Sequence, residues 1–225
     1  MSFVSEFEII DAFVKSENMF RKSEKLNKYE KKIYAKCKET PTEILAYIES
    51  NEQDKYIRWY IAQNPNSDKN IVASLSLDND EHTVGFAAES LSATPDILFR
   101  LSKDNSVFIR RCVAGNPSTP VGCLTLLSKD EDSHVRWKVA GNIHTDLNDV
   151  RILLNDVDYY VREHALRNIN RVDHKIEYDP KDIIQVCNGI EYENLDPITH
   201  STGYEYDWEK DFDKDFKNAM NKGGE

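Results

Sequence analysis

Arginine and tryptophan recur at a fixed interval in the middle of this sequence. Four arginines stand at multiples of 26 residues from one another: Arg58, Arg110, Arg136 and Arg162. The next position holds Trp59, Arg111 and Trp137, and Lys138 follows the last of these. Guanidinium groups form paired hydrogen bonds with carboxylates or phosphates, and indole rings stack on other flat groups. These residue types therefore indicate binding through ion pairs and stacking.

Two interpretations of the arginine column are open from the sequence. In the first, each guanidinium binds a helix-capping carboxylate between successive units, so that the column forms a ladder of ion pairs. In the second, the arginines join a basic stripe with interleaved tryptophans that also includes Lys55, Lys138, Arg167 and Arg171. Such a stripe would bind an acidic, aromatic peptide or follow a phosphate backbone and stack bases. The first interpretation does not account for the tryptophans.

Residues typical of catalysis or metal binding show no comparable order. The sequence has no GxSxG, no glycine-rich phosphate loop and no HExxH, and its six histidines lack metal-ligand spacing. Its four cysteines form no CxxC, so neither a zinc site nor a disulfide framework is indicated. Paired acids recur at every repeat junction, which favours helix capping over acid–base chemistry. We therefore predict a non-enzymatic protein with no catalytic residues, no cofactor and no metal.

The arginines belong to a 26-residue repeat that runs from Asp54 to Asn168. One position holds a residue typical of a helix N-cap in all five units: Asp54, Asp80, Ser106, Asp132 and Asp158. Two apolar columns follow, four residues apart, and so lie on one face of a first helix. This helix is expected to end at an Asn-Pro or Asn-Ile pair, because Asn tolerates left-handed backbone and Pro cannot continue a helix.

A second short helix is expected in each unit. It would begin near Ser67, Thr94, Thr119 and Thr145, and a half unit would precede the array with Thr40 as its cap. This helix would bury a leucine column: Leu75, Leu101, Leu127 and Leu153. Two helices per 26 residues with little or no strand predict an all-α solenoid, in which several units must stack before any is stable.

Three phrases carry a resemblance to a known family: HVRWKVAGN, FIRRCVAGNPSTPVGCLTLLSKDEDS and YIRWYIAQNPNS. They resemble the leucine-rich repeat variant family, whose units read VRxxVAxNPxTPxxxLxxLAxDxD. The resemblance covers about residues 40–171 and implies a right-handed superhelix in which an α-helix pairs with a tighter helix. Some relatives have a cysteine-rich iron–sulfur segment ahead of the repeats, but only Cys37 stands there in this chain, so no cluster is carried over. Looser similarity links such units to HEAT-like repeats, which serve mostly as protein-binding scaffolds and in one branch as alkylpurine DNA glycosylases.

The sequence predicts three regions: an N-terminal helical cap at 1–39, the repeat array at 40–171, and a C-terminal cap with an acidic aromatic tail at 172–225. Of the net charge of -11, most belongs to the last region, which holds 6 basic and 14 acidic residues. The tail sets aromatic residues among these acids: Tyr204, Tyr206, Trp208, Phe212 and Phe216. Helical spacing places Trp208, Phe212 and Phe216 on one face, so we expect an amphipathic helix that is ordered only when something covers that face.

The expected function is protein binding. No apolar run approaches the length that spans a bilayer, and the first residues are acidic where a signal peptide is basic, so we expect a soluble, cytoplasmic protein with no membrane contact. The partner would be another protein, bound by the starts of the first helices or by the acidic tail. The alternative is binding of nucleic acid, or inhibition of a nucleic-acid-binding protein through phosphate mimicry by the tail. The Lys-, Asn- and Tyr-rich composition suits a bacterial or phage accessory protein.

Overall fold

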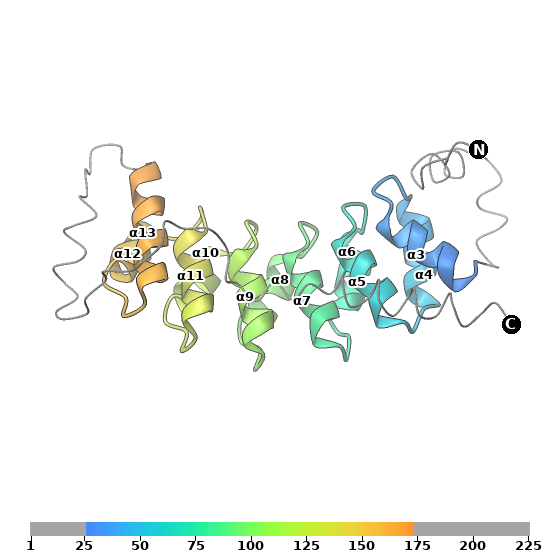
Figure 1. Cartoon of the computed structure of the whole chain (residues 1–225), viewed down its shortest axis with the longest axis horizontal. Helices are drawn as coiled ribbons and strands as arrows, with labels where there is room; N and C mark the ends of the chain where they lie inside the picture. Colours follow the sequence, from blue (N-terminus) through green and yellow to red (C-terminus); the bar gives the residue numbers. More distant parts are fainter. Residues whose placement is uncertain (1–25, 173–225) are drawn as a thin grey trace, which may run out of the picture. The chain divides into compact units, whose positions relative to one another are not determined.

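The structure is a computed structural model that describes residues 26–172, all of which belong to one compact unit. Over this range the chain is helical with no strand, and the helices follow one another along a repeat array (Figure 1). The all-α solenoid predicted from the 26-residue period is confirmed. Expectations for residues 1–25 and 173–225, including the acidic tail, lie outside the described residues. Within 26–172, no helix combines the length and the apolar character needed to cross a membrane.

The first helices of the five units are α5 (Lys55–Gln63), α7 (Glu81–Glu89), α9 (Val107–Gly115), α11 (Ser133–Gly141) and α13 (Tyr159–Val172). Each of the first four packs against the first helix of the next unit. The predicted caps are present: for example, the Asp132 carboxylate accepts hydrogen bonds from the amides of His134 and Val135 at 2.9 and 3.2 Å. Because every first helix starts at an equivalent residue, the same side-chain positions recur along one side of the array.

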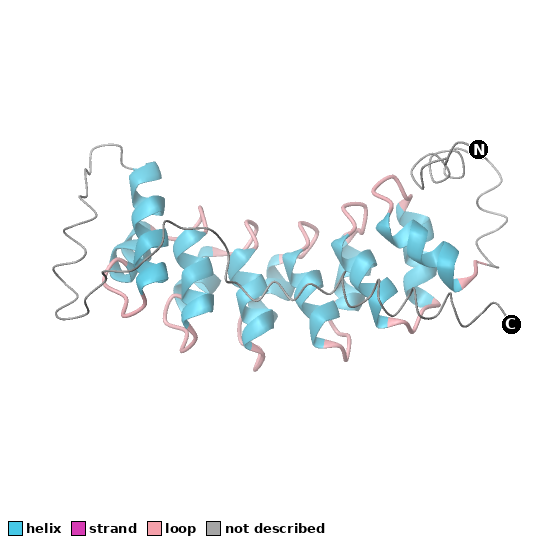
Figure 2. Cartoon of the chain, viewed as in Figure 1, coloured by secondary structure: helices cyan, strands magenta, loops and turns pink. Residues whose placement is uncertain are grey.

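The second helices are α4 (Thr42–Ser50), α6 (Lys69–Leu75), α8 (Pro95–Leu101), α10 (Val121–Leu127) and α12 (Leu147–Leu153). Short loops join them to the first helices (Figure 2). The prediction that Thr40 caps α4 is wrong: Pro41 is the N-cap, and the Thr40 hydroxyl donates to the Tyr34 carbonyl at 2.7 Å. Thr119 and Thr145 make the equivalent bond to a carbonyl six residues back, so this column closes the end of the first helix.

The apolar core lies between the two rows of helices. Leu127 is 1% exposed, as its place in the leucine column predicts, and the leucines of the other units are buried equally. The small column on the first helices is also fully buried, with Ala88, Ala114 and Ala140 at no measurable exposure. Small side chains at these positions allow neighbouring first helices to approach closely, which brings their exposed residues into one continuous row.

The asparagine column ties each unit to the one before it. Asn142 has extended backbone, so the expected left-handed conformation is wrong. Its side-chain amide donates instead to the carbonyls of Ala114 and Asn116 in the preceding unit, at 2.8 and 3.0 Å. Asn116 and Asn168 make the equivalent pair of bonds. Asparagine is used here because one amide group supplies two donors to carbonyls that the end of a helix leaves unsatisfied.

One further helix precedes these units. Helix α3 (Lys28–Lys36) begins with a capping box, in which Asn27 and Glu30 exchange hydrogen bonds between side chain and backbone. It packs against α5 and α4, in the place that a first helix takes in the later units. Lys31 binds Glu52 at 3.1 Å, so the ion pairs described below have a Lys–Glu counterpart at this end.

Candidate functional site

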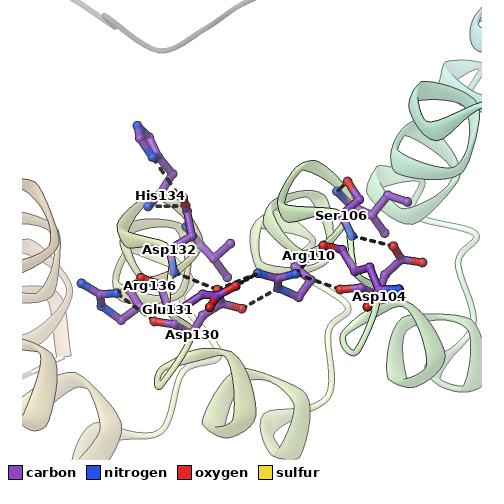
Figure 3. A network of polar contacts seen from close by, with 11 residues as sticks. Asp104, Ser106, Arg110, Asp130, Glu131, Asp132, His134 and Arg136 are labelled. Atoms are coloured by element: carbon purple, nitrogen blue, oxygen red, sulfur yellow. Dashed lines mark hydrogen bonds and ion pairs between the residues drawn. The ribbon is translucent and has the colours of Figure 1, made fainter.

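The arginine column forms ion pairs between units. Arg110 donates from Nε and Nη2 to the two carboxylate oxygens of Asp130, at 2.7 and 3.0 Å. Its Nη1 turns the other way and donates to the carbonyls of Asp104 and Asn105, at 2.8 and 3.0 Å (Figure 3). We call the loop that links one unit to the next a junction. The guanidinium of Arg110 thus connects the junction before its own unit, at Asp104 and Asn105, to the junction after it, at Asp130.

The same contacts recur one unit later. Arg136 donates to the Asp156 carboxylate at 2.7 and 2.9 Å and to the carbonyls of Asp130 and Glu131. Arg58 binds Asp78 at 2.6 Å. In the last described unit, Arg162 donates to the carbonyls of Asp156 and Val157, and its buried Nε lacks a partner within residues 26–172. The four predicted arginines therefore have their guanidinium groups engaged at unit junctions.

The predicted ladder uses a different carboxylate from the one expected. The sequence interpretation paired each arginine with a helix cap such as Asp132, but the guanidinium of Arg110 binds Asp130, two residues earlier. Asp130 is available because it does not cap a helix; it accepts instead from the Asp132 amide at 3.0 Å. At this junction Asp130 therefore binds the arginine, whereas Asp132 caps the helix.

The electrostatics of the junction follow from these bonds. Burial alone would raise the pKa of Asp130, but hydrogen bonds from Arg110 and from the Asp132 amide, with the arginine charges, hold this pKa below its ordinary value. The pKa of Asp156 is lowered in the same way by Arg136 and the Asp158 amide. The pairs are therefore ionised near neutral pH and stabilise the array.

Trp59 and Trp137 have different surroundings. Trp59 is 2% exposed, and its indole nitrogen donates to the Asp80 carboxylate at 2.5 Å. Trp137 is half-buried, packs edge-on against His164 with ring centroids 5.0 Å apart, and has the Lys138 ammonium 5.1 Å from its ring centroid. Trp59 thus helps to hold the junction, whereas part of Trp137 faces outward beside a cation.

Aromatic rings form a row across α5, α7 and α9. The Trp59 ring lies 5.0 Å from that of His82 and 5.8 Å from that of Phe86, and Phe108 continues the row at 5.1 Å from His82. Gly85 makes room for this arrangement, because a Cβ there would overlap the Phe108 ring. Sequence reasoning missed His82, Phe86 and Phe108, although the second and sixth positions of the first helices are aromatic or histidine in several units.

Cationic side chains lie over these rings. The Lys55 ammonium is 5.6 Å from the Trp59 ring centroid, and the Arg111 guanidinium is 5.4 Å from that of Phe108. Cations at such distances are attracted to the ring face. We call the set Lys55, Trp59, His82, Phe86, Phe108, Arg111, Trp137 and Lys138 the cation–aromatic face. The predicted contact residues Tyr204, Tyr206, Trp208, Phe212 and Phe216 lie outside the described residues.

The described residues offer little reactive chemistry. No group of three or more His, Cys, Asp or Glu within 26–172 is arranged to hold a metal ion. Burial, followed by the neighbouring Glu89 carboxylate, raises the pKa of the Cys112 thiol far above its ordinary value, so this cysteine is a poor nucleophile. Burial also lowers the pKa of His164, followed by the charge of Arg167.

Comparison with solved structures gives similarities that bear on the fold. A protein described as a leucine-rich repeat variant with a novel repetitive structural motif superposes with a TM-score of 0.50 at 21% sequence identity, over 82% of this chain and 71% of that one. A comparison with models of protein families gives no match, and a comparison with curated proteins gives none either.

The fold is therefore that of a leucine-rich repeat variant, as the repeat phrases indicated. Proteins of this architecture are helical-repeat scaffolds, in which equivalent side chains from successive units build an extended surface.

Proposed function

We propose that this chain is a non-enzymatic scaffold that binds another protein through the cation–aromatic face. The observation that carries the proposal is the pairing of half-buried rings with cations on neighbouring first helices: Arg111 lies over Phe108 on α9, and Lys138 lies over Trp137 on α11. Rings beside cations complement a partner surface that presents carboxylates among apolar or aromatic groups. The partner chemistry we infer is therefore acidic and aromatic.

The column arginines have a supporting role in this proposal. Arg110 is 9% exposed and Arg162 is 4% exposed, and both guanidinium groups bind within the array. Their contribution to partner binding is to fix the spacing of the first helices, and so the spacing of the residues that carry the face. Arg111, Trp137 and Lys138 are half-buried and, unlike Arg58 and Arg136, take no part in the ion pairs at the junctions, so these predicted contact residues remain available for direct contact.

Binding of protein is favoured over binding of nucleic acid by charge. Residues 54–171 hold 14 basic and 16 acidic residues, so the array as a whole does not attract a polyanion. A few local cations suffice for an acidic peptide, whose binding also uses the rings. The acidic tail remains the second proposed contact segment, through its aromatic residues.

Site-specific photocrosslinking would test the proposal. A photoreactive amino acid at Lys138 is expected to capture the partner from cell extract, whereas the same probe at Arg151, which is exposed on second helix α12, serves as the control. The captured protein would then be purified and its affinity measured for the chain with and without residues 200–225, which separates the face from the tail.

Charge reversal identifies the surface. Arg111→Glu with Lys138→Glu is expected to weaken partner binding at least tenfold, whereas Lys129→Glu with Arg151→Glu makes the same charge change at exposed positions elsewhere and should leave affinity within about twofold. Equal affinity of the two double variants would refute the cation–aromatic face as the contact surface. Tight binding of DNA or RNA at physiological salt that falls steeply as salt rises would favour the nucleic-acid alternative instead.

A further inference from the structure

The junction between the second and third units lacks the arginine found at its neighbours. Val84 stands on α7 at the position equivalent to Arg58, Arg110 and Arg136. The aspartate that such an arginine would bind is nevertheless present, because Asp104 is equivalent to Asp78, Asp130 and Asp156. Asp104 accepts a hydrogen bond from the Ser106 amide at 2.9 Å, as Asp130 does from Asp132. Its carboxylate is therefore held in the orientation used at the neighbouring junctions.

The backbone acceptors are also present. At the next junction, Nη1 of Arg110 donates to the carbonyls five and six residues before it, and Arg136 and Arg162 do the same. Counted from Val84, these are the carbonyls of Asp78 and Asn79. No backbone hydrogen bond to either of them comes from the turns, loops and caps of residues 26–172. The three acceptor groups that an arginine at position 84 would bind are thus present, two carbonyls at the first junction and one carboxylate at the second, without the donor that joins them elsewhere.

A pocket occupies the place of the missing side chain. It has a volume of about 450 Å³, and its lining includes Val84, the three acceptor residues Asp78, Asn79 and Asp104, and Glu81. The Arg58 guanidinium forms an ion pair with the Asp78 carboxylate at 2.6 Å, which balances the charge of Asp78. The Glu81 carboxylate accepts a hydrogen bond from the Ser106 hydroxyl. Asp104 has no ion-pair partner among the described residues. The pocket therefore carries negative charge at the point where the other junctions hold a guanidinium.

Arg100 also lines this pocket, but it is directed to other acceptors. Its Nη2 donates to the hydroxyl of Ser76 at 2.7 Å and to the carbonyl of the same residue at 3.2 Å. It makes no ion pair with Asp104 in the described structure. Asp78 is already paired with Arg58, so its charge is balanced. The carboxylates of Glu81 and Asp104 and the guanidinium of Arg100 then give the pocket a net charge of about −1.

We propose that this pocket binds the guanidinium group of an arginine side chain presented by the partner protein. Guanidinium fits better than ammonium, because its planar fork reaches a carboxylate on one side and two carbonyls on the other, as Arg110 and Arg136 do in this chain. The arginine enters from outside because position 84 supplies none. The identity of the donor as a partner protein rests on the proposed function, whereas the preference for guanidinium does not.

An NMR titration of the full chain tests the pocket without the partner. The probe is N-acetyl-arginine amide, observed through the amide signals of Asn79 and Ser106. A single charge-assisted hydrogen bond supports a dissociation constant on the order of ten millimolar, which this method measures. The expected result is saturable shifts of both signals, and at least tenfold weaker binding of N-acetyl-citrulline amide, which has nearly the same shape without the charge. N-acetyl-lysine amide is expected to bind more weakly than the arginine probe.

Three variants locate the binding. Asp104→Asn keeps an acceptor for the Ser106 amide but removes the charge, and Val84→Arg fills the pocket from within, so both should abolish the shifts. Asp96→Asn removes an exposed carboxylate of α8 outside the pocket and should leave binding within about twofold. Helical circular dichroism verifies that each variant folds. Equal binding of the arginine and citrulline probes, no saturable shift in the wild type, or undiminished binding by Val84→Arg would overturn the proposal.

Two further measurements test the source of the arginine. Free L-arginine, which carries extra charges on its backbone, should bind no more tightly than N-acetyl-arginine amide. Much tighter binding would indicate a small-molecule ligand and would refute a partner protein as the source of the guanidinium. Val84→Arg should also weaken binding of the purified partner, and undiminished partner binding would refute its use of this pocket. Because the probe titration needs no partner, failure of the proposed function and failure of the guanidinium pocket give different results.

Discussion

The junction after Arg110 and the junction after Val84 share a backbone pattern but differ in how their polar groups are satisfied. In the first, the guanidinium of Arg110 joins Asp130 to the carbonyls of Asp104 and Asn105. In the second, the acceptors are retained around an open pocket. The loop geometry therefore does not depend on the arginine at every junction, since the aspartate also holds the amide two residues on.

This difference shows which contacts hold successive units together with and without the arginine. Where the arginine is present, it fixes the distance between successive first helices. Where it is absent, the apolar columns and the asparagine column hold the units together: Asn116 still binds the carbonyls of Ala88 and Ser90 across the second junction. A repeat array can thus lose one polar contact, keep its fold, and gain a site for a group from outside.

The largest expected effect is the loss of stability when a core leucine is shortened, and it should fall in the same range at both junctions. Leu127→Ala is expected to lower the free energy of unfolding by about 2–5 kcal/mol, because it leaves a cavity among fully buried side chains. Leu101→Ala should cost less within that range, because Leu101 already borders the open pocket. Chemical denaturation would measure both. A cost below about 1 kcal/mol for Leu127→Ala would contradict its place in the core.

The next effect concerns the polar contacts. Arg110→Met is expected to cost about 1–3 kcal/mol, because it leaves the Asp130 carboxylate and two carbonyls without their donor. Asp104→Asn at the open junction should cost about 0.5 kcal/mol or less, because no described cation is lost and the Ser106 amide keeps its acceptor. Thermal unfolding of the two variants gives the comparison. Equal costs would mean that the arginine adds nothing to its junction.

The smallest expected effect is a difference in acid sensitivity. The folded-state pKa of Asp130 is lowered, so the stability it contributes is fully present above the ordinary carboxyl pKa and is lost as pH falls through the lowered value. Asp156 acts in the same direction. In Arg110→Met the loss attributable to Asp130 should be smaller, because the main cause of the lowered pKa is gone. Unfolding curves between about pH 2 and pH 6 test this, and an unchanged pH dependence in the variant would contradict it.

The fold could be predicted because the period of the sequence fixes it. A spacing of 26 residues with an N-cap, two apolar columns and a leucine column admits few structures other than stacked helix pairs. The N-caps and the burial of Leu127 followed directly. The carboxylate partner of Arg110 did not, because Asp130 and Asp132 recur with the same period and only the backbone decides which one the guanidinium reaches.

The candidate site was less predictable because it combines residues that are distant in sequence. The ring row is built from three helices, and Phe108 joins it only because residue 85 has no side chain. The sequence shows that Val84 interrupts the arginine column, but it does not show the consequence. The space left by the missing arginine can be filled by neighbouring side chains or can stay open as a pocket. The role of asparagine was misassigned for a similar reason: its acceptors lie 26 and 28 residues back along the chain.

A double-mutant cycle at Val84 and Asp104 tests the central claim most directly, namely that the acceptor groups around Val84 form a complete guanidinium site. The free energy of unfolding would be measured for the wild type, Val84→Arg, Asp104→Asn and the double variant. If the site is complete, Val84→Arg raises stability in the presence of Asp104 and loses that gain in the Asp104→Asn background, with a coupling energy of about 1–3 kcal/mol. A Val84→Arg variant that is destabilised equally in both backgrounds would contradict the claim.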